Sequence, residues 1–319
     1  MKRIVAFVSL AILLLGACSV ARAADKIHAG TPAGNNFTFL PLRIGIDRGA
    51  YAQEGLDVDA TDFGGGAKLQ QAMVAGAIDI AVTAGTDFAF VAKGAPELGV
   101  ATMGNHPTLG MVIPYDSPAK TGADMKGKKI GVTTVGSLTE WLARRYAASQ
   151  GWGVDGFTIV AIGSDLQNQV ALMSTGQVDG LVAPVGFGLQ LELQKRGRLL
   201  FNSFDDAKSE FLAEAIFASK TLIASNPDAV RRFLNAWFEN MAWMQSHKAE
   251  TVEAARKYTG YVPEVEAKEY DLVMPRFSST GKFDPDALKQ LGQSFVEMKV
   301  FETAPDLSQL YTEAYLPKK

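Results

Sequence analysis

The chain has 319 residues with a formal net charge of −3, 47% hydrophobic residues and a single cysteine. A chain this close to charge balance, and slightly acidic, lacks the basic excess with which proteins bind nucleic acid or an anionic membrane surface. A single cysteine also excludes a disulfide within the chain.

The first 23 residues have the pattern of an export signal. Lys2 and Arg3 precede an apolar stretch, Ile4–Ala17, and the run Ala21–Ala23 supplies the small-x-small pattern that signal peptidases cut. The apolar stretch is shorter than the ~20 residues that cross a bilayer. We therefore expect residues 1–23 to be removed and the mature protein to be periplasmic.

A second processing route involves Cys18. The run LGAC resembles a lipobox, in which this cysteine would carry lipid and anchor the protein. We favour cleavage after Ala23, because Ala-x-Ala lies at a normal distance from the apolar stretch. The mature chain then has 28 basic and 34 acidic side chains and no cysteine, since the signal holds three basic residues and no acidic one. We expect no nucleic-acid partner, and no membrane insertion of the mature chain unless Cys18 is lipidated.

Short apolar runs alternate with helical stretches over the first 220 residues. The expected order is strand and turn at 26–32, mainly helix at 36–55, strand at 56–63, helix at 67–77 and strand at 79–85, and it repeats after residue 128. Such alternation is typical of parallel strands joined by crossover helices. Beyond residue 220, helical spacing of apolar residues predicts helices at 226–247, 248–260, 262–277 and 284–300.

An internal repeat relates two parts of the chain at a constant offset of 100 residues. The segment GGGAKLQQAMVAGAIDIAVTAG (64–85) matches SDLQNQVALMSTGQVDGLVAPV (164–185), and both hold Gly-x-x-Asp, at Gly76–Asp79 and Gly176–Asp179. Each copy reads as loop, helix, turn, buried strand and loop. We expect two lobes built on one plan, with the loops of the two copies across a cleft. Two βαβ units that resemble each other by chance are the alternative.

The stretch TTVGSLTEW (133–141) marks the end of a strand and the start of a helix. Ser137 and Glu140 have the spacing of a capping box, and Gly136 precedes them. The first N–H groups of a helix lack partners within it, and with the helix dipole they can bind an anion. From these residues alone, Ser137 is either only a helix cap or also a ligand contact.

Five stretches follow one another in the order of a known family. They are FLPLRIGIDRGAYAQEGLDVD (39–59), GGGAKLQQAMVAGAIDIAV (64–82), SPAKTGADMKGKKIGVTTVGSLTEWLARRYAASQGW (117–152), LQNQVALMSTGQVDGLVAP (166–184) and IFASKTLIASNPDAVRRFLNAW (216–237). In this order, behind an export signal, the chain resembles the periplasmic solute-binding proteins of nitrate, taurine and alkanesulfonate ABC importers.

The resemblance implies a type II periplasmic-binding fold, an α/β architecture of two lobes. Each lobe is a mixed sheet flanked by helices, and the ligand cleft lies between the lobes. Lobe 1 is expected at 24–112 and 214–319 and lobe 2 at 113–213, with crossovers near Gly110–Tyr115 and Phe211–Ala215. The implied function is capture of a small polar or anionic molecule and its delivery to an ABC importer permease, by a protein that we expect to be a monomer.

In this family the ligand is held by loops after strands and by the helix N-termini that follow them. Carried over residue by residue, these positions are Asn35, Asn36, Phe37, Gly64, Gly65, Gly85, Thr86, Gly136, Ser137 and Phe187. On this basis Ser137 is a ligand contact as well as a cap. No catalytic residue, metal ligand or cofactor is expected.

Two departures from the family pattern bear on the ligand. The stretch APVGFG (183–188) stands where relatives often carry a Trp-x-Pro-like run, so this loop offers less aromatic surface. Asp87 follows Thr86 where relatives are usually neutral and Ser-rich. Asp87 either favours the start of its helix through the dipole, which we prefer, or faces the cleft and repels an anion.

An enzyme and a sensor are the competing functions. His28, His106 and His247 lie far apart without metal-ligand spacing, and His106, near the first crossover, is the one candidate to reach the cleft. The sequence has no Gly-x-Ser-x-Gly elbow or Walker motif. Thiamin-pyrimidine synthases use the same fold, but their cysteine-rich motif cannot exist in a chain whose one cysteine is Cys18. A ligand-sensing module for a signalling partner is the remaining alternative.

Overall fold

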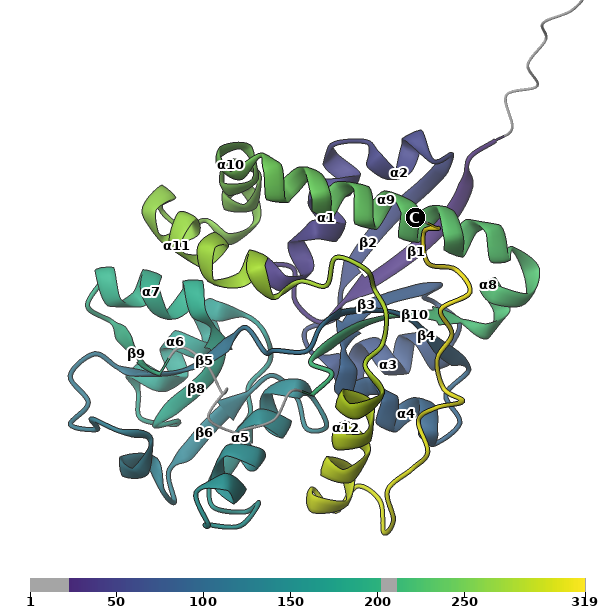
Figure 1. The fold of residues 1–319 in the computed structure, drawn as a ribbon. Coiled ribbons are helices and arrows are strands. Elements are labelled where there is room, and N and C mark those ends of the chain that lie inside the picture. Colours follow the sequence, from purple (N-terminus) through teal and green to yellow (C-terminus); the bar gives the residue numbers. More distant parts are fainter. Residues whose placement is uncertain (1–22, 202–210, 319) are drawn as a thin grey trace, which may run out of the picture.

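The computed structural model describes residues 23–201 and 211–318, which form two α/β lobes around two five-stranded sheets (Figure 1). The predicted export signal at 1–23, with Cys18, lies outside the described residues apart from Ala23. Within the described ranges, no helix combines the length and the apolar character needed to cross a membrane. The α/β class with two mixed sheets, expected from the sequence, is confirmed.

The first sheet has the strand order β2-β1-β3-β10-β4. β1 runs parallel to β2 and β3, whereas β10 runs antiparallel to β3 and β4. The strands are β1 (Asp25–Thr31), β2 (Leu56–Asp62), β3 (Ile80–Ala84), β4 (Glu97–Gly104) and β10 (Glu214–Ser219).

The second sheet repeats this plan in the order β7-β6-β8-β5-β9. β6 runs parallel to β7 and β8, and β5 runs antiparallel to β8 and β9. The strands are β5 (Leu109–Pro114), β6 (Lys129–Val132), β7 (Thr158–Ala161), β8 (Gly180–Pro184) and β9 (Gly197–Phe201). In each sheet, the antiparallel strand next to the three parallel strands directly follows a crossover from the other lobe. This strand is β10 in the first sheet and β5 in the second.

Helices cover both sheets, as parallel strands require. Those of the first lobe are α1 (Leu40–Asp47), α2 (Ala50–Gln53), α3 (Gly66–Val74), α4 (Phe88–Ala92), α8 (Lys220–Ser225), α9 (Pro227–Ser246) and α10 (Lys248–Thr259). The second lobe has α5 (Leu138–Ser149), α6 (Leu166–Ser174) and α7 (Val185–Leu193). The C-terminal helices are α11 (Pro263–Val273) and α12 (Pro285–Glu297). Short 3-10 turns are η1 (Phe37–Phe39), η2 (Gly85–Asp87), η3 (Gly122–Met125) and η5 (Met274–Arg276).

Strand β10 is buried along its whole length. Its side chains alternate between the two faces of the sheet, and both faces are packed. Ala215 and Phe217 belong to a core cluster that continues into the second lobe, whereas Ile216 and Ala218 belong to the cluster under α1 and α9. A strand with two buried faces has no polar face, which explains why the sequence shows a continuous apolar run here.

The repeated Gly-x-x-Asp motif has the same structure in both lobes. Gly76 and Gly176 have φ of 73° and 71°, the left-handed conformation in which a helix commonly ends at glycine. Three residues later, Asp79 Oδ2 accepts the His28 backbone N–H, and Asp179 Oδ2 accepts that of Lys129, both at 2.8 Å. The motif therefore ends one helix and ties the next strand to its parallel neighbour, β3 to β1 in the first sheet and β8 to β6 in the second.

Two crossovers between the lobes lie side by side. Ala213 N donates to the Gly104 carbonyl at 3.1 Å, and Phe211 N donates to the Asn105 carbonyl at 3.4 Å. The first crossover occupies residues 105–108, whereas the expected Gly110–Tyr115 coincides largely with β5, which already pairs with β8 and β9. Residues 109–112, which the resemblance placed in lobe 1, thus contribute to the second sheet.

The C-terminal helices contact the second lobe as well as the first. Tyr261 and Val265, at the start of α11, belong to the apolar cluster of the second lobe around Phe187. On α12, Ser294 Oγ accepts a hydrogen bond from Trp141 Nε1 of α5 at 2.9 Å. Figure 1 shows α11 above α7 and α12 beside α5, so two separate contacts join the lobes outside the crossovers.

The repeated aspartates give a direct test of the duplicated plan. Asp79→Ala and Asp179→Ala each remove the acceptor of a backbone N–H in a strand, so each should lower the free energy of unfolding by about 1 kcal/mol. Urea unfolding of the single variants measures this loss. Because neither side chain lines the cleft described below, ligand affinity should stay at the wild-type value. A variant that loses affinity without losing stability would contradict the structural role.

Candidate functional site

The space between the lobes is bordered by helix starts that correspond across the two sheets. Asn36 caps η1 through a bond from Thr38 N, and Ser137 caps α5 from the equivalent position after β6. Gly65 and Asp165 stand in the same way before α3 and α6. The first N–H groups of a helix lack partners within the helix, so an arrangement of helix starts around one space is suited to a ligand with polar groups.

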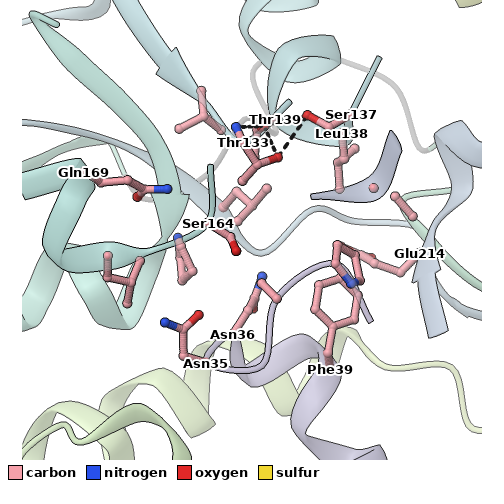
Figure 2. Close-up of a pocket in the computed structure, with 18 residues that line it drawn as sticks. Asn35, Asn36, Phe39, Thr133, Ser137, Leu138, Thr139, Ser164, Gln169 and Glu214 are labelled. Carbon is pink, nitrogen blue, oxygen red and sulfur yellow. Dashed lines mark hydrogen bonds between the residues drawn. The ribbon is translucent and has the colours of Figure 1, made fainter. Parts of the chain in front are cut away.

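A cleft lies between these elements, with an empty volume of about 620 Å³ that is continuous with solvent. Figure 2 shows Asn35, Asn36 and Phe39 on one side of it and Thr133, Ser137 and Thr139 on the opposite side. Its lining residues are Pro32, Ala33, Asn35, Asn36, Phe39, Gly66, Ala84, Leu109, Thr133, Ser137, Leu138, Thr139, Ser164, Leu166, Gln169, Val182, Pro184 and Glu214. Both lobes therefore contribute polar groups and apolar walls.

Of the residues that the sequence predicted for the site, Asn35, Asn36 and Ser137 line this cleft. Thr86 and Gly136 lie instead at a second, more open depression between α4, α5 and α12, where Ser137 is again part of the wall. These five positions thus lie at the junction of the lobes. The cleft is on one side of the loop before α5, and the depression is on its other side.

Three further predicted positions lie in the cores or at a crossover and line neither the cleft nor the depression. Phe37 is fully buried, and its ring packs edge-on against Tyr270. Phe187 is 4% exposed in the core of the second lobe. Gly85 N donates to the Ala213 carbonyl at 2.8 Å, so this residue fixes the second crossover to β3. The aromatic rings pack into the cores because burial of their area favours folding.

Gly64 and Gly65 lie where the lobes approach each other. A Cβ atom on Gly65 would lie 2.5 Å from Thr134 Cγ2 of the second lobe, and the φ of Gly65 is 143°, which L residues rarely adopt. A Cβ atom on Gly64 would lie 3.9 Å from Ser164 Oγ, with no closer neighbour. Only glycine at position 65 therefore permits this approach of the backbone to Thr134.

Ser137 serves its own helix in this structure. Its hydroxyl donates to the Thr134 carbonyl at 2.7 Å and lies 3.5 Å from Glu140 N. Glu140 Oε2 accepts the Gly136 N–H at 2.6 Å, whereas the Ser137 N–H donates to the Thr134 carbonyl at 3.3 Å. The predicted capping box therefore forms only in its Ser137 half, because Glu140 binds one residue before the cap. Glu140 thus brings a carboxylate to the start of α5, where Arg144 pairs with its other oxygen at 2.8 Å.

Asp87 and His106 lie near the cleft but do not line it. Asp87 is fully buried, and its Oδ2 accepts hydrogen bonds from Gln70 and Thr83, both at 2.8 Å. Burial raises the pKa of Asp87 to about 7, although the two hydrogen bonds act to lower it. His106 borders a small cavity that shares Glu214 with the cleft and lies next to the first crossover.

Glu214 is the cleft residue that sequence reasoning missed. It begins β10 directly after the second crossover, is 3% exposed, and lines both the cleft and the small cavity that His106 borders. Burial raises the pKa of its carboxyl to about 8, and attraction to Arg276 acts in the opposite direction. The available signal was an acidic residue within the apolar run FLAEAIFAS (211–219).

No lysine or arginine is present among the described residues that line the cleft, so Glu214 is its one ionisable group. The described ranges also hold no group of three or more His, Cys, Asp or Glu side chains placed to bind a metal. The chemistry that the cleft offers is hydrogen bonding, apolar contact and one carboxyl.

The contrast between Gly65 and Gly64 tests whether the lobes meet in solution. Gly65→Ala should destabilise the protein, and adding Thr134→Ala should recover part of the loss, because it removes the atoms that clash. A coupling of at least ~0.5 kcal/mol between the two substitutions, from thermal or urea unfolding, is expected for residues in contact.

Gly64→Ala is the matched control for this cycle. It also places alanine at a positive φ, 73°, but without a close neighbour, so it should cost ~1 kcal/mol and show no coupling to Thr134→Ala. Additive effects for Gly65 and Thr134 would mean that the two lobes do not touch at this point.

The comparisons with known proteins agree with this architecture. A sequence profile described as NMT1/THI5 like matches residues 36–251. A protein of Brucella abortus (strain 2308), named as a binding protein, is 26% identical over 223 residues, which span 67% of this chain and 66% of the relative, slightly less than two thirds of its length. Riboflavin-binding protein RibY of Chloroflexus aurantiacus is 24% identical over 286 residues, 82% of this chain and 79% of that protein.

Solved structures share the fold at low sequence identity. The alkanesulfonate-binding protein SsuA from Xanthomonas axonopodis pv. citri, bound to MOPS, has a TM-score of 0.74 at 18% identity and covers 89% of this chain and 96% of its own. The desulfurization enzyme DSZB has a TM-score of 0.65 at 14% identity, with 91% of this chain and 97% of its own covered. The expected two-lobed binding-protein fold is therefore confirmed, and the profile match over most of the sequence shows that the chain belongs to the NMT1/THI5-like family.

Proposed function

We propose that the protein is an extracytoplasmic solute-binding receptor that captures a small polar molecule between its lobes and delivers it to an ABC importer. The observation that carries this proposal is the cleft itself, with facing helix starts at Asn36 and Ser137 and polar lining from both lobes. A site shared by two bodies is suited to a ligand that holds them together.

The comparisons support a binding role and leave the ligand open. RibY is named for riboflavin and SsuA for alkanesulfonates, so one fold accommodates chemically different ligands. The permease partner, periplasmic location and monomeric state of this chain are parts of the same proposal. They rest on the export pattern at residues 1–23 and on the family order of its motifs.

An enzyme on the same fold is a weaker candidate. DSZB shows that the fold can carry a reaction, but its likeness to this chain is one of fold alone. In the described cleft, Glu214 is the one ionisable side chain, and the described residues that line the cleft include no histidine or cysteine that could act as nucleophile or base. A sensing module would use the same cleft, and its distinction from a receptor depends on the partner rather than on this site.

A ligand screen with a shape measurement tests the receptor role. Thermal shifts of the purified protein with sulfonates, nitrate, amino acids, pyrimidines and aromatic acids should identify compounds that raise the melting temperature. A ligand at 100 times its Kd adds about 2.7 kcal/mol of stability. Small-angle X-ray scattering should then show a smaller radius of gyration with the best ligand than without it. An unchanged radius at saturation would argue against closure.

A further inference from the structure

Glu214 is a buried residue at the edge of the cleft, and no described residue donates a hydrogen bond to its carboxyl oxygens. The residue is 3% exposed, and the hydrogen bond from Thr102 Oγ1, at 3.4 Å, ends on its backbone carbonyl and not on its carboxyl group. Figure 2 shows Glu214 at the edge of the same space as Asn36 and Phe39. Buried polar groups normally have partners, so this one is suited to a partner from the ligand.

Arg276 does not fill this role from the cleft side. It borders only the small cavity beside Glu214, where its Nη1 donates to the Pro107 carbonyl at 2.8 Å. Glu214 lines both spaces, whereas Arg276 is not among the described residues that line the cleft. The attraction of Arg276 also leaves the pKa of Glu214 raised, at about 8, which shows that burial outweighs it.

The cleft offers an anion little compensation. Its described lining has no lysine or arginine, and the start of α5 already holds the Glu140 carboxylate at 2.6 Å from Gly136 N. A buried anion needs an opposite charge or several donors directed at it, because desolvation of a charge is costly. A cation placed against Glu214 would instead pair two groups that are both costly to bury alone.

We propose that the cleft takes a compact organic cation, with an amine, amidine or guanidine group held by Glu214 and an apolar body held by the surrounding walls. The apolar walls come from Phe39, Leu109 and Leu138, with Val182 and Pro184 from the repeated strand β8. Amidines and guanidines can pair with a carboxylate through two parallel hydrogen bonds. This inference rests on the proposed receptor function and specifies its ligand class.

Three probes of equal shape separate charge from size. Benzamidine, benzamide and benzoate are planar and nearly isosteric, and they carry a positive, zero and negative charge at pH 7. Isothermal titration calorimetry and ligand-observed NMR on the purified exported chain should rank benzamidine above benzamide and benzoate. Glu214→Gln keeps the shape and hydrogen-bonding capacity of the side chain without its charge, so it should weaken benzamidine binding roughly 10- to 100-fold and change benzamide little.

Glu97→Gln is the matched control. Glu97 is also fully buried with a raised pKa of about 8, and it lies on β4 at the opposite end of the β4–β10 pair from Glu214, away from the cleft lining. It should leave benzamidine binding at the wild-type value, which separates a charge effect in the cleft from a general effect of removing a buried carboxyl.

Three outcomes would overturn the ligand class. Benzoate binding as strongly as benzamidine, or benzamidine binding that Glu214→Gln leaves unchanged, would each show that Glu214 does not select a cation. Absence of benzamidine binding at millimolar concentration would do so as well. The receptor function is judged separately, because a sulfonate or other anion that stabilises the protein and closes the lobes would preserve that role while rejecting the cation.

Discussion

The structure depends on an exchange of strands between the two lobes. Each sheet receives one antiparallel strand from a chain segment that has just crossed over, β5 in the second sheet and β10 in the first. β5 pairs with β8, and β10 pairs with β3. The ends of the repeated strands β3 and β8 therefore meet at the crossovers. The cleft forms there, and Glu214 lies at its edge as the first residue of β10.

The contacts outside the crossovers differ on the two sides of the molecule. On one side, Glu269 of α11 accepts the Gly186 N–H of α7 at 3.0 Å, and burial raises the pKa of Glu269 to about 8. On the other side, the Trp141–Ser294 bond is accompanied by an ion pair between Arg145 and Glu297 at 2.7 Å. When the lobes rotate relative to each other, each contact must either break or be kept by a movement of the C-terminal helix that makes it. The C-terminal helices therefore influence how far the cleft can open.

The elements that local pattern determines were predictable from the sequence. The Gly-x-x-Asp repeat predicted two equivalent lobes because left-handed glycines and the following aspartates have local roles that spacing reveals. The helix cap at Ser137 was predictable for the same reason, and it is confirmed because the Ser137 side chain accepts the Glu140 N–H.

Features that depend on long-range pairing were not predictable. Phe37 follows two residues that line the cleft, but its ring is drawn into the core by Tyr270, far away in the chain. Phe187 lies on a helix that is apolar on most sides, so periodicity gives no direction. Glu214 is one acid in an apolar strand, and only the pairing of β10 with β3 and β4 places it in the cleft.

Closure of two lobes over the cleft is most directly tested by cross-linking Gly64 to Ser164. A Cβ atom at residue 64 lies 3.9 Å from Ser164 Oγ, and a chain that starts at Ala24 has no other cysteine. The pair Gly64→Cys and Ser164→Cys should form a disulfide on mild oxidation, faster with a stabilising ligand. The pair Gly76→Cys and Gly176→Cys, where neither glycine has a neighbour within 4 Å, should not. Equal cross-linking of both pairs, or a rate that ligand does not change, would contradict a cleft that closes on its solute.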